Sequence, residues 1–142
     1  MGMNNSEIRE WLHSIDIYDY DIYDGIVHVV GDVNISYQWL TSIPIQFGYV
    51  SGDFYCSHNK LTSLSGCPSE VGGFFDCFGN NLVSLEGCPT EVGGFFDCFG
   101  NNLVSLEGGP KIVGGHFLCC DNLFKDEPDV SGIRIGGEFA WK

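Results

Sequence analysis

One segment of this chain is duplicated without a single change. Residues 71–87 recur letter for letter at residues 92–108, so the second copy starts 21 positions after the first. A short fixed period is typical of a solenoid, in which each repeat forms one structural turn that cannot bury its apolar side alone. The duplication therefore predicts a stack of coils that presents a surface, rather than an enzyme built around a pocket.

The period extends well beyond the two identical copies. Aligned at 21-residue intervals, residues of one kind fall into columns from about residue 26 to residue 139, with one extra residue before the last copy. We therefore predict an N-terminal helical cap and linker over residues 1–25 and a single solenoid domain of 21-residue repeats over residues 26–142. The clearest columns are Val50, Val71, Val92 and Val113; Phe54, Phe75, Phe96 and Phe117; Cys56, Cys77, Cys98 and Cys119; Asn59, Asn80, Asn101 and Asn122; and Leu61, Leu82 and Leu103.

Residues 74–78 of the repeat alternate in the manner of a short β-strand. In a strand, successive side chains point to opposite faces, so Phe75 and Cys77 are predicted to face the core, whereas Phe74, Asp76 and Phe78 are predicted to face solvent. Successive coils would then pair as parallel strands. The asparagine of each repeat follows the strand, where its side chain can satisfy the backbone groups of the turn.

The N-terminal segment has the pattern of a short capping helix. Ser6 is a suitable N-cap residue, and Ile8, Trp11 and Leu12 fall on one helical face. A helix here would cover the open end of the solenoid, which would otherwise expose a hydrophobic core and a free strand edge. The expected fold is thus a mainly-β solenoid with one capping helix and little other helix.

The order strand, Asn, Leu, x, x, Leu and Pro resembles the leucine-rich repeat. More closely, the string Leu-x-Gly-Cys-Pro-x-x-Val-Gly-Gly-x-Phe-x-Cys-x-x-Asn-x-Leu-x-Ser-Leu is similar to a family of leucine-rich-repeat-like proteins common in bacteriophage genomes, and the resemblance covers nearly the whole chain. It implies a phage-encoded protein that works in the host cytoplasm. It brings no catalytic residues with it. The sequence departs from the standard repeat near Gly72, where two glycines begin the strand in place of a leucine.

Charge and cysteine content restrict the classes of partner. The formal net charge is −13 and the chain has six Lys and Arg, too few to neutralise many phosphates, so direct nucleic-acid binding is not expected. The acidic surface favours either simple solubility or attraction to a basic partner. Seven cysteines, without a secretory segment or an apolar run of membrane-spanning length, predict a cytoplasmic protein with reduced thiols and no membrane contact.

The residues with chemical potential have simpler interpretations as parts of the repeat. The cysteine column also contains Ile35, which indicates small buried apolar groups rather than metal ligands, since a metal site needs ligands that converge on one point. Asp76 and Asp97 are a pair because the segment was copied. The histidines lie in different columns or in distant coils, without a nucleophile. We therefore expect no catalytic residues, cofactor or metal.

The outward strand face is the candidate functional site. Four phenylalanines that point out of a small protein form an apolar band, and such bands usually mark an interaction surface. The predicted function is a non-enzymatic interaction module that binds a host protein. Two alternatives stay open: an acidic decoy that inhibits a host nucleic-acid-binding or defence enzyme, and a structural homodimer. The predicted partner-binding residues are Tyr55, Phe74, Asp76, Phe78, Phe95, Asp97, Phe99 and His116.

Overall fold

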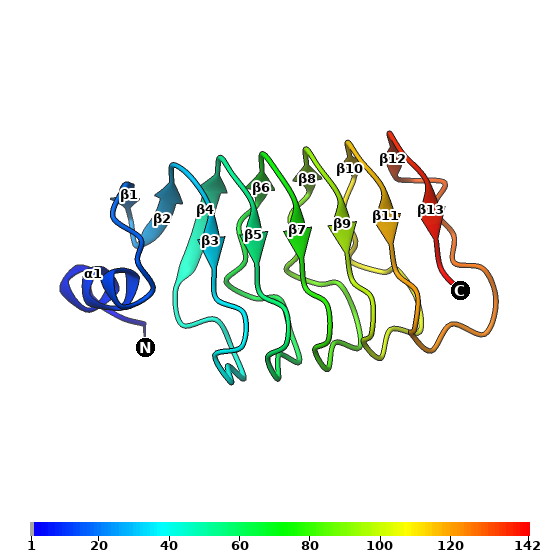
Figure 1. The fold of residues 1–142 in the computed structure, drawn as a ribbon, viewed down its shortest axis with the longest axis horizontal. Coiled ribbons are helices and arrows are strands. Elements are labelled where there is room, and N and C mark those ends of the chain that lie inside the picture. Colours follow the sequence, from blue (N-terminus) through cyan, green and yellow to red (C-terminus); the bar gives the residue numbers. More distant parts are fainter. Residues whose placement is uncertain (1) are drawn as a thin grey trace.

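A computed structural model describes residues 2–142. It shows a mainly-β solenoid of about five turns, with one short helix at the N-terminal end (Figure 1), as the repeat predicted. No helix among the described residues is long and apolar enough to cross a membrane. The elements are α1 (Asn5–Ser14), β1 (Tyr20–Tyr23), β2 (Ile26–Val29), β3 (Val33–Asn34), β4 (Gln46–Val50), β5 (Phe54–Tyr55), β6 (Glu70–Val71), β7 (Phe75–Asp76), β8 (Glu91–Val92), β9 (Phe96–Asp97), β10 (Ile112–Val113), β11 (Phe117–Leu118), β12 (Arg134–Ile135) and β13 (Phe139–Ala140).

Each regular coil contributes two very short strands, one to each of two sheets. The first sheet has the order β1-β2-β4-β6-β8-β10-β12 and carries the valine column, and the second has the order β13-β11-β9-β7-β5-β3 and carries the phenylalanine column. All the pairs are parallel except β1 with β2. Phe75 pairs in register with Phe96, one period on, and Phe117 pairs with Phe139, which accommodates the extra residue of the last coil.

The prediction of a single strand over residues 74–78 was therefore too long and incomplete. The strand β7 is limited to Phe75–Asp76, and the first sheet was not predicted at all. The two strands of a coil are joined at the Gly-Gly pair, where successive coils approach closely. A Cβ atom on Gly93 would collide with the carbonyl oxygen of Gly72, and one on Gly94 would collide with the ring of Phe74. Glycine at both positions is a steric requirement of this corner.

The predicted core columns are buried. Phe75, Cys77, Phe96 and Cys98 are 0% exposed, and the rings of Phe75 and Phe96 lie 5.0 Å apart between centroids. Leucines from the far side of the coil complete the core between the two sheets. Together with the valines, these columns form one continuous cluster along the solenoid, with the members Val50, Val71, Val92 and Val113; Phe54 and Phe117; Cys56 and Cys119; and Leu61, Leu64, Leu82, Leu85, Leu103 and Leu106.

The asparagine column forms a buried hydrogen-bonded ladder that ties each coil to the one before. The Asn80 amide nitrogen donates to the carbonyl oxygens of Cys77 in its own coil (3.1 Å) and Cys56 in the preceding coil (3.0 Å). Its side-chain oxygen accepts the backbone N–H of Leu61 at 3.1 Å. Since Asn101 repeats the same contacts one coil on, the ladder satisfies backbone groups in the turn, where the sheet ladders do not reach.

The predicted N-cap at Ser6 was wrong. Asn4 is the N-cap residue, because its side-chain oxygen accepts the N–H of Glu7 (2.9 Å) while the Glu7 carboxylate accepts the N–H of Asn4 (3.0 Å), a complete capping box. This reciprocal pair satisfies two helical N–H groups. Ser6 lies inside α1 and is exposed. The helix buries Ile8 and Leu12 as expected, and β1 adds an antiparallel strand that covers the edge of β2.

Candidate protein-interaction face

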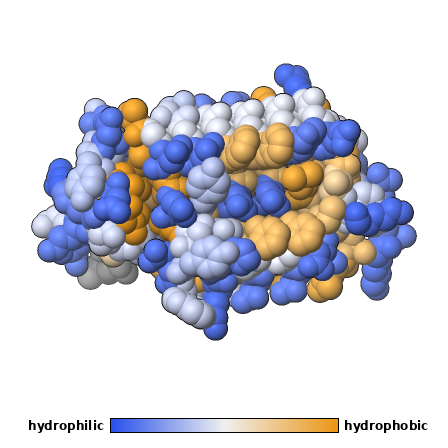
Figure 2. Space-filling view, viewed as in Figure 1, coloured by the Kyte–Doolittle hydropathy of each residue, from blue (hydrophilic) through white to orange (hydrophobic). Residues whose placement is uncertain are grey.

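All eight predicted site residues lie on the outer face of the six-stranded sheet, where they form three rows. We call this surface the strand face and define it by these residues. Its two aromatic rows are separated by a row of carboxylates, and Figure 2 shows the apolar patches on either side of hydrophilic atoms. The first aromatic row is Phe74, Phe95 and His116; the carboxylate row is Asp76 and Asp97, with Tyr55 in register beside Asp76; and the second aromatic row is Phe78 and Phe99.

The first aromatic row is the more exposed. The Phe74 and Phe95 rings are stacked with centroids 4.9 Å apart, and the ring of His116 follows at 4.6 Å. Each phenyl ring lies over the second glycine of the next coil, yet Phe74 remains 43% exposed and Phe95 37%. Thus the rings fold partly onto the glycine corner and still present a continuous apolar edge to solvent.

The second aromatic row is longer than the sequence indicated. The half-buried Phe78 and Phe99 rings are stacked 4.9 Å apart at an interplanar angle of 3°. His58 lies 4.9 Å from Phe78, and Tyr37 stacks on His58 at 4.5 Å, so four rings form one row. We did not predict Tyr37 or His58, because they share a repeat column with Gly79 rather than with the phenylalanines. The signal that could have identified them is an aromatic side chain in a repeat column where later coils have glycine.

The carboxylate row is half-buried between the aromatic rows. Asp76 accepts the backbone N–H of Phe78 and Asp97 accepts that of Phe99, each at 2.9 Å. Burial raises the pKa of both carboxyl groups; for Asp97 the nearby Asp76 raises the pKa further, while the Phe99 N–H opposes the rise. The row therefore carries negative charge in a partly desolvated position, an arrangement that favours a cationic group from outside.

Replacing Asp97 with asparagine should raise the melting temperature at pH 7. A folded-state pKa above the unfolded value means that this group favours folding when protonated, and that the contribution is lost as pH rises through the folded-state pKa. Asparagine keeps an oxygen for the Phe99 N–H and removes the charge. The gap between D97N and the parent protein should close near about pH 3, where the aspartate is protonated in both states. Thermal unfolding at the two pH values checks this; a gap that widens in acid would contradict it.

Tyr55 and His116 lie at opposite ends of the strand face, and each is held by a hydrogen bond. The Tyr55 hydroxyl donates to the Asp53 carboxylate at 2.8 Å, and this bond, with burial and nearby carboxylates, raises the Tyr55 pKa to about 12. At the other end, the His116 Nδ1 accepts the backbone N–H of Glu138 at 2.8 Å. Both side chains are therefore fixed in orientation by hydrogen bonds within the protein.

The seven cysteines are all free. Cys77 and Cys98 lie in the core, and burial is the main cause that raises the pKa of each thiol well above its usual range. Among the described residues, no group of three or more His, Cys, Asp or Glu is placed to hold a metal ion. The column thus supplies small apolar packing groups, as the presence of Ile35 in it suggested.

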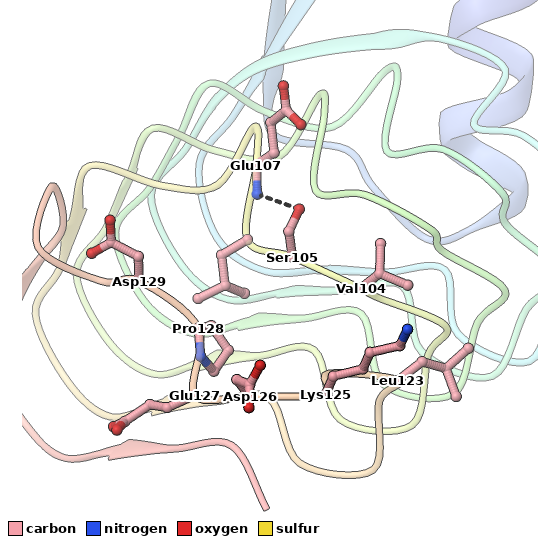
Figure 3. A pocket seen from close by; sticks show the side chains of 10 residues that line it. Val104, Ser105, Glu107, Leu123, Lys125, Asp126, Glu127, Pro128 and Asp129 are labelled. Carbon is pink, nitrogen blue, oxygen red and sulfur yellow. Dashed lines mark hydrogen bonds between the residues drawn. The ribbon is translucent and has the colours of Figure 1, made fainter.

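A hollow lies away from the strand face, beside residues 125–129. It has a volume of about 500 Å³, with Val104, Leu106 and Leu123 on one side and the residues 125–129 on the other. Figure 3 shows the Ser105 hydroxyl directed at the backbone N–H of Glu107, which it accepts at 3.3 Å. Neither histidine nor cysteine is among the residues that line this hollow, so Ser105 has no imidazole beside it to act as a base.

Comparison of the chain with protein-family models, with curated proteins and with solved structures found no match.

Proposed function

We propose that this protein is a non-enzymatic interaction module whose strand face binds a protein partner. The observation that carries the proposal is the pair of stacked aromatic rows, which expose apolar surface on a scaffold whose core is continuous. Exposed, ordered aromatic side chains lose little conformational entropy on binding, and aromatic groups dominate the energetics of protein interfaces. If the resemblance to the phage family holds, the partner is a cytoplasmic host protein.

The shape of the face supports a protein rather than a small ligand. Its rows cross successive coils of the second sheet, and neighbouring rings and carboxylates are in register from one coil to the next. The surface is therefore extended and regular rather than enclosed. The carboxylate row between the two aromatic rows restricts the charge of the partner, because it favours a partner that presents basic groups between apolar ones.

Replacing Phe78 and Phe99 together with serine should abolish capture of the partner from a host lysate. Both rings are half-buried and lie outside the core, so the solenoid should persist. The matched control replaces Val83 and Val104 with serine, since these are also apolar residues repeated one coil apart, and they are 61% and 66% exposed. Affinity capture with mass spectrometry checks the result. Recovery of the same proteins by F78S/F99S, with circular dichroism unchanged, would reject the proposal.

An acidic decoy is the second candidate, and one specific observation favours it. Glu70 and Glu91 are in-register neighbours on parallel strands and both are exposed, so the first sheet carries stacked like charges beyond those of the strand face. A decoy binds chiefly through charge, and its affinity should fall steeply as salt is raised from about 50 to 500 mM. Binding through the strand face should weaken less over the same range, because its apolar contacts are not screened by salt, so the steepness of one titration against a captured partner separates the two functions.

A structural homodimer through the same aromatic rows is the third candidate. Sedimentation of the protein at two concentrations tests it, because a dimer would dissociate on dilution while a monomer would sediment unchanged. The F78S/F99S variant serves here as well. A dimer that this variant abolishes would assign the rows to self-association.

A further inference from the structure

One row of the first sheet changes the sign of its charge along the solenoid. Its residues come directly before those of the valine column, so they lie on the outer side of the sheet, and each pairs in register with the next: Tyr49, Glu70, Glu91, Ile112 and Arg134. The residue before Ile112 is Lys111, whereas the two preceding coils have Ser69 and Thr90 at that position. Two acidic coils are therefore followed by two basic coils. We call Glu70, Glu91, Lys111 and Arg134 the charge row.

The charge row is open to a group from outside. All four of its side chains are exposed. The in-register neighbour of both Glu91 and Arg134 is the uncharged Ile112, which separates the two signs. On the acidic coils, Glu70 and Glu91 are directly opposite each other on strands about 4.8 Å apart, and like charges in this position repel. A basic group from outside therefore relieves a repulsion that the fold itself creates.

A hollow of about 400 Å³ lies at the basic end of the charge row. The residues that line it are Lys111, Ile112, Ser131, Gly132, Ile133 and Arg134. The last coil brings the two cations together, because the backbone N–H of Arg134 donates to the carbonyl oxygen of Lys111 at 2.8 Å. The chain has six Lys and Arg in all, and two of them border this one hollow. It is therefore a basic site on an acidic protein, and its chemistry suits a carboxylate.

The order of signs in the charge row is complementary to itself. Figure 1 shows the coils stacked along a nearly straight line, so two charge rows can run side by side in opposite directions. A twofold axis parallel to the strands, between β8 and β10, places Glu70 of one copy opposite Arg134 of the other. The same axis places Glu91 opposite Ile112, with Lys111 beside it. Because the interface is symmetric, the two copies make four contacts between opposite charges.

We propose that a second copy of this chain binds to the charge row in this antiparallel arrangement, with the Glu70 and Glu91 carboxylates of each copy at the basic hollow of the other. The inference goes beyond the proposed function, because it uses the first sheet and leaves the strand face open in both copies. The net charge of −13 on each copy opposes association, so only an arrangement that sets opposite signs together is favoured. Exposed ion pairs contribute little each, so the dimer is weak and forms at high protein concentration.

The test is sedimentation equilibrium of the full chain over a wide range of concentrations in about 150 mM salt, which gives the dissociation constant of the dimer. The E70K/E91K variant should raise this constant by about tenfold or more, because it turns all four contacts into contacts between like charges. The variant also changes the net charge from −13 to −9, so general repulsion between the copies predicts the opposite result, a tighter dimer. Tighter or unchanged association of E70K/E91K would overturn the inference.

Exchanging the signs within the charge row should restore the dimer. The fourfold variant E70K/E91K/K111E/R134E has the same net charge as the parent protein and again sets opposite charges together, so its dissociation constant should return to that of the parent. The matched control is E86K/E107K, because these two glutamates are also exposed and repeated one coil apart but lie outside both sheets, and this variant should not weaken the dimer. A fourfold variant that stays monomeric, with its circular dichroism unchanged, would reject the arrangement.

This inference and the proposed function fail separately. A parent protein that is monomeric at every concentration overturns the inference and leaves the strand-face function standing. A dimer that F78S/F99S abolishes and E70K/E91K leaves intact assigns self-association to the strand face and also overturns it. If the parent is monomeric and E70K/E91K loses a captured protein, the charge row binds that protein and not a second copy. Zero-length carbodiimide coupling of mixed ¹⁴N and ¹⁵N protein should join Glu91 of one copy to Lys111 of the other, and a dimer without this link would contradict the register.

Discussion

Replacing Phe96 with alanine should lower the free energy of unfolding by about 3–5 kcal/mol. The Phe96 side chain is 0% exposed, and its ring contacts those of Phe75 and Phe117, each 5.0 Å away between centroids. Alanine would leave a cavity in the middle of a core column whose neighbours belong to two other coils. Urea denaturation, with the slope of the transition compared between variants, measures the loss.

The neighbouring residue provides the matched control. Phe95 is the same residue type one position earlier, but it is 37% exposed on the strand face. Its replacement with alanine removes a stacked ring and only part of its burial, so we expect a loss of about 1–2 kcal/mol. Equal losses from F95A and F96A, or the reverse order, would contradict the assignment of inner and outer faces.

Replacing Asn80 with alanine should cost about 2–4 kcal/mol, the second largest effect that the structure predicts. The change orphans the buried N–H of Leu61, which the Asn80 side-chain oxygen accepts. It also removes one of two asparagine bonds to each of the carbonyls of Cys56 and Cys77; the other bonds, from Asn59 and Asn101, remain. The expected loss of stability therefore combines the cost of one unsatisfied buried donor with that of two lost hydrogen bonds.

Asn81 is the control for this prediction. It is the adjacent asparagine in the same turn, it is exposed, and substitution at such a position usually changes stability by less than about 0.5 kcal/mol. The stabilities of N80A and N81A are compared by the same urea denaturation. If both variants lose little, the asparagine column is not a structural ladder, and the close fit of the turns has another cause.

The inward and outward pattern of the strand face was predictable because the sequence repeats. A period that places Phe75 over Phe96 and Phe74 over Phe95 leaves two orientations of the strand, one with Phe75 in the core and one with Phe74 in the core. The cysteine that alternates with Phe75 on the same face favours the first orientation. The first sheet was not predictable in the same way, because its strands β6 and β8 are two residues long and are followed by glycines, which weaken any strand pattern. Backbone contacts between coils form that sheet, and they leave little trace in the side chains.

The candidate site was likewise predictable only in part. The eight predicted residues lie on one face because alternation along a strand and stacking between coils are both regular. The extension of the second aromatic row to Tyr37 and His58 was missed, because both residues stand on left-handed turns that the strand pattern does not describe.

Thiol labelling of the native protein tests the stacking of the coils most directly, because seven cysteines report on different depths in one experiment. With a maleimide reagent and peptide mass spectrometry, Cys120 and then Cys88 should react first, since both are only half-buried. Cys56, Cys67, Cys77, Cys98 and Cys119 should stay unmodified until urea unfolds the chain. Rapid labelling of Cys77 and Cys98 in the folded protein would show that the strand faces are inverted, and the strand face described above would then lie in the core.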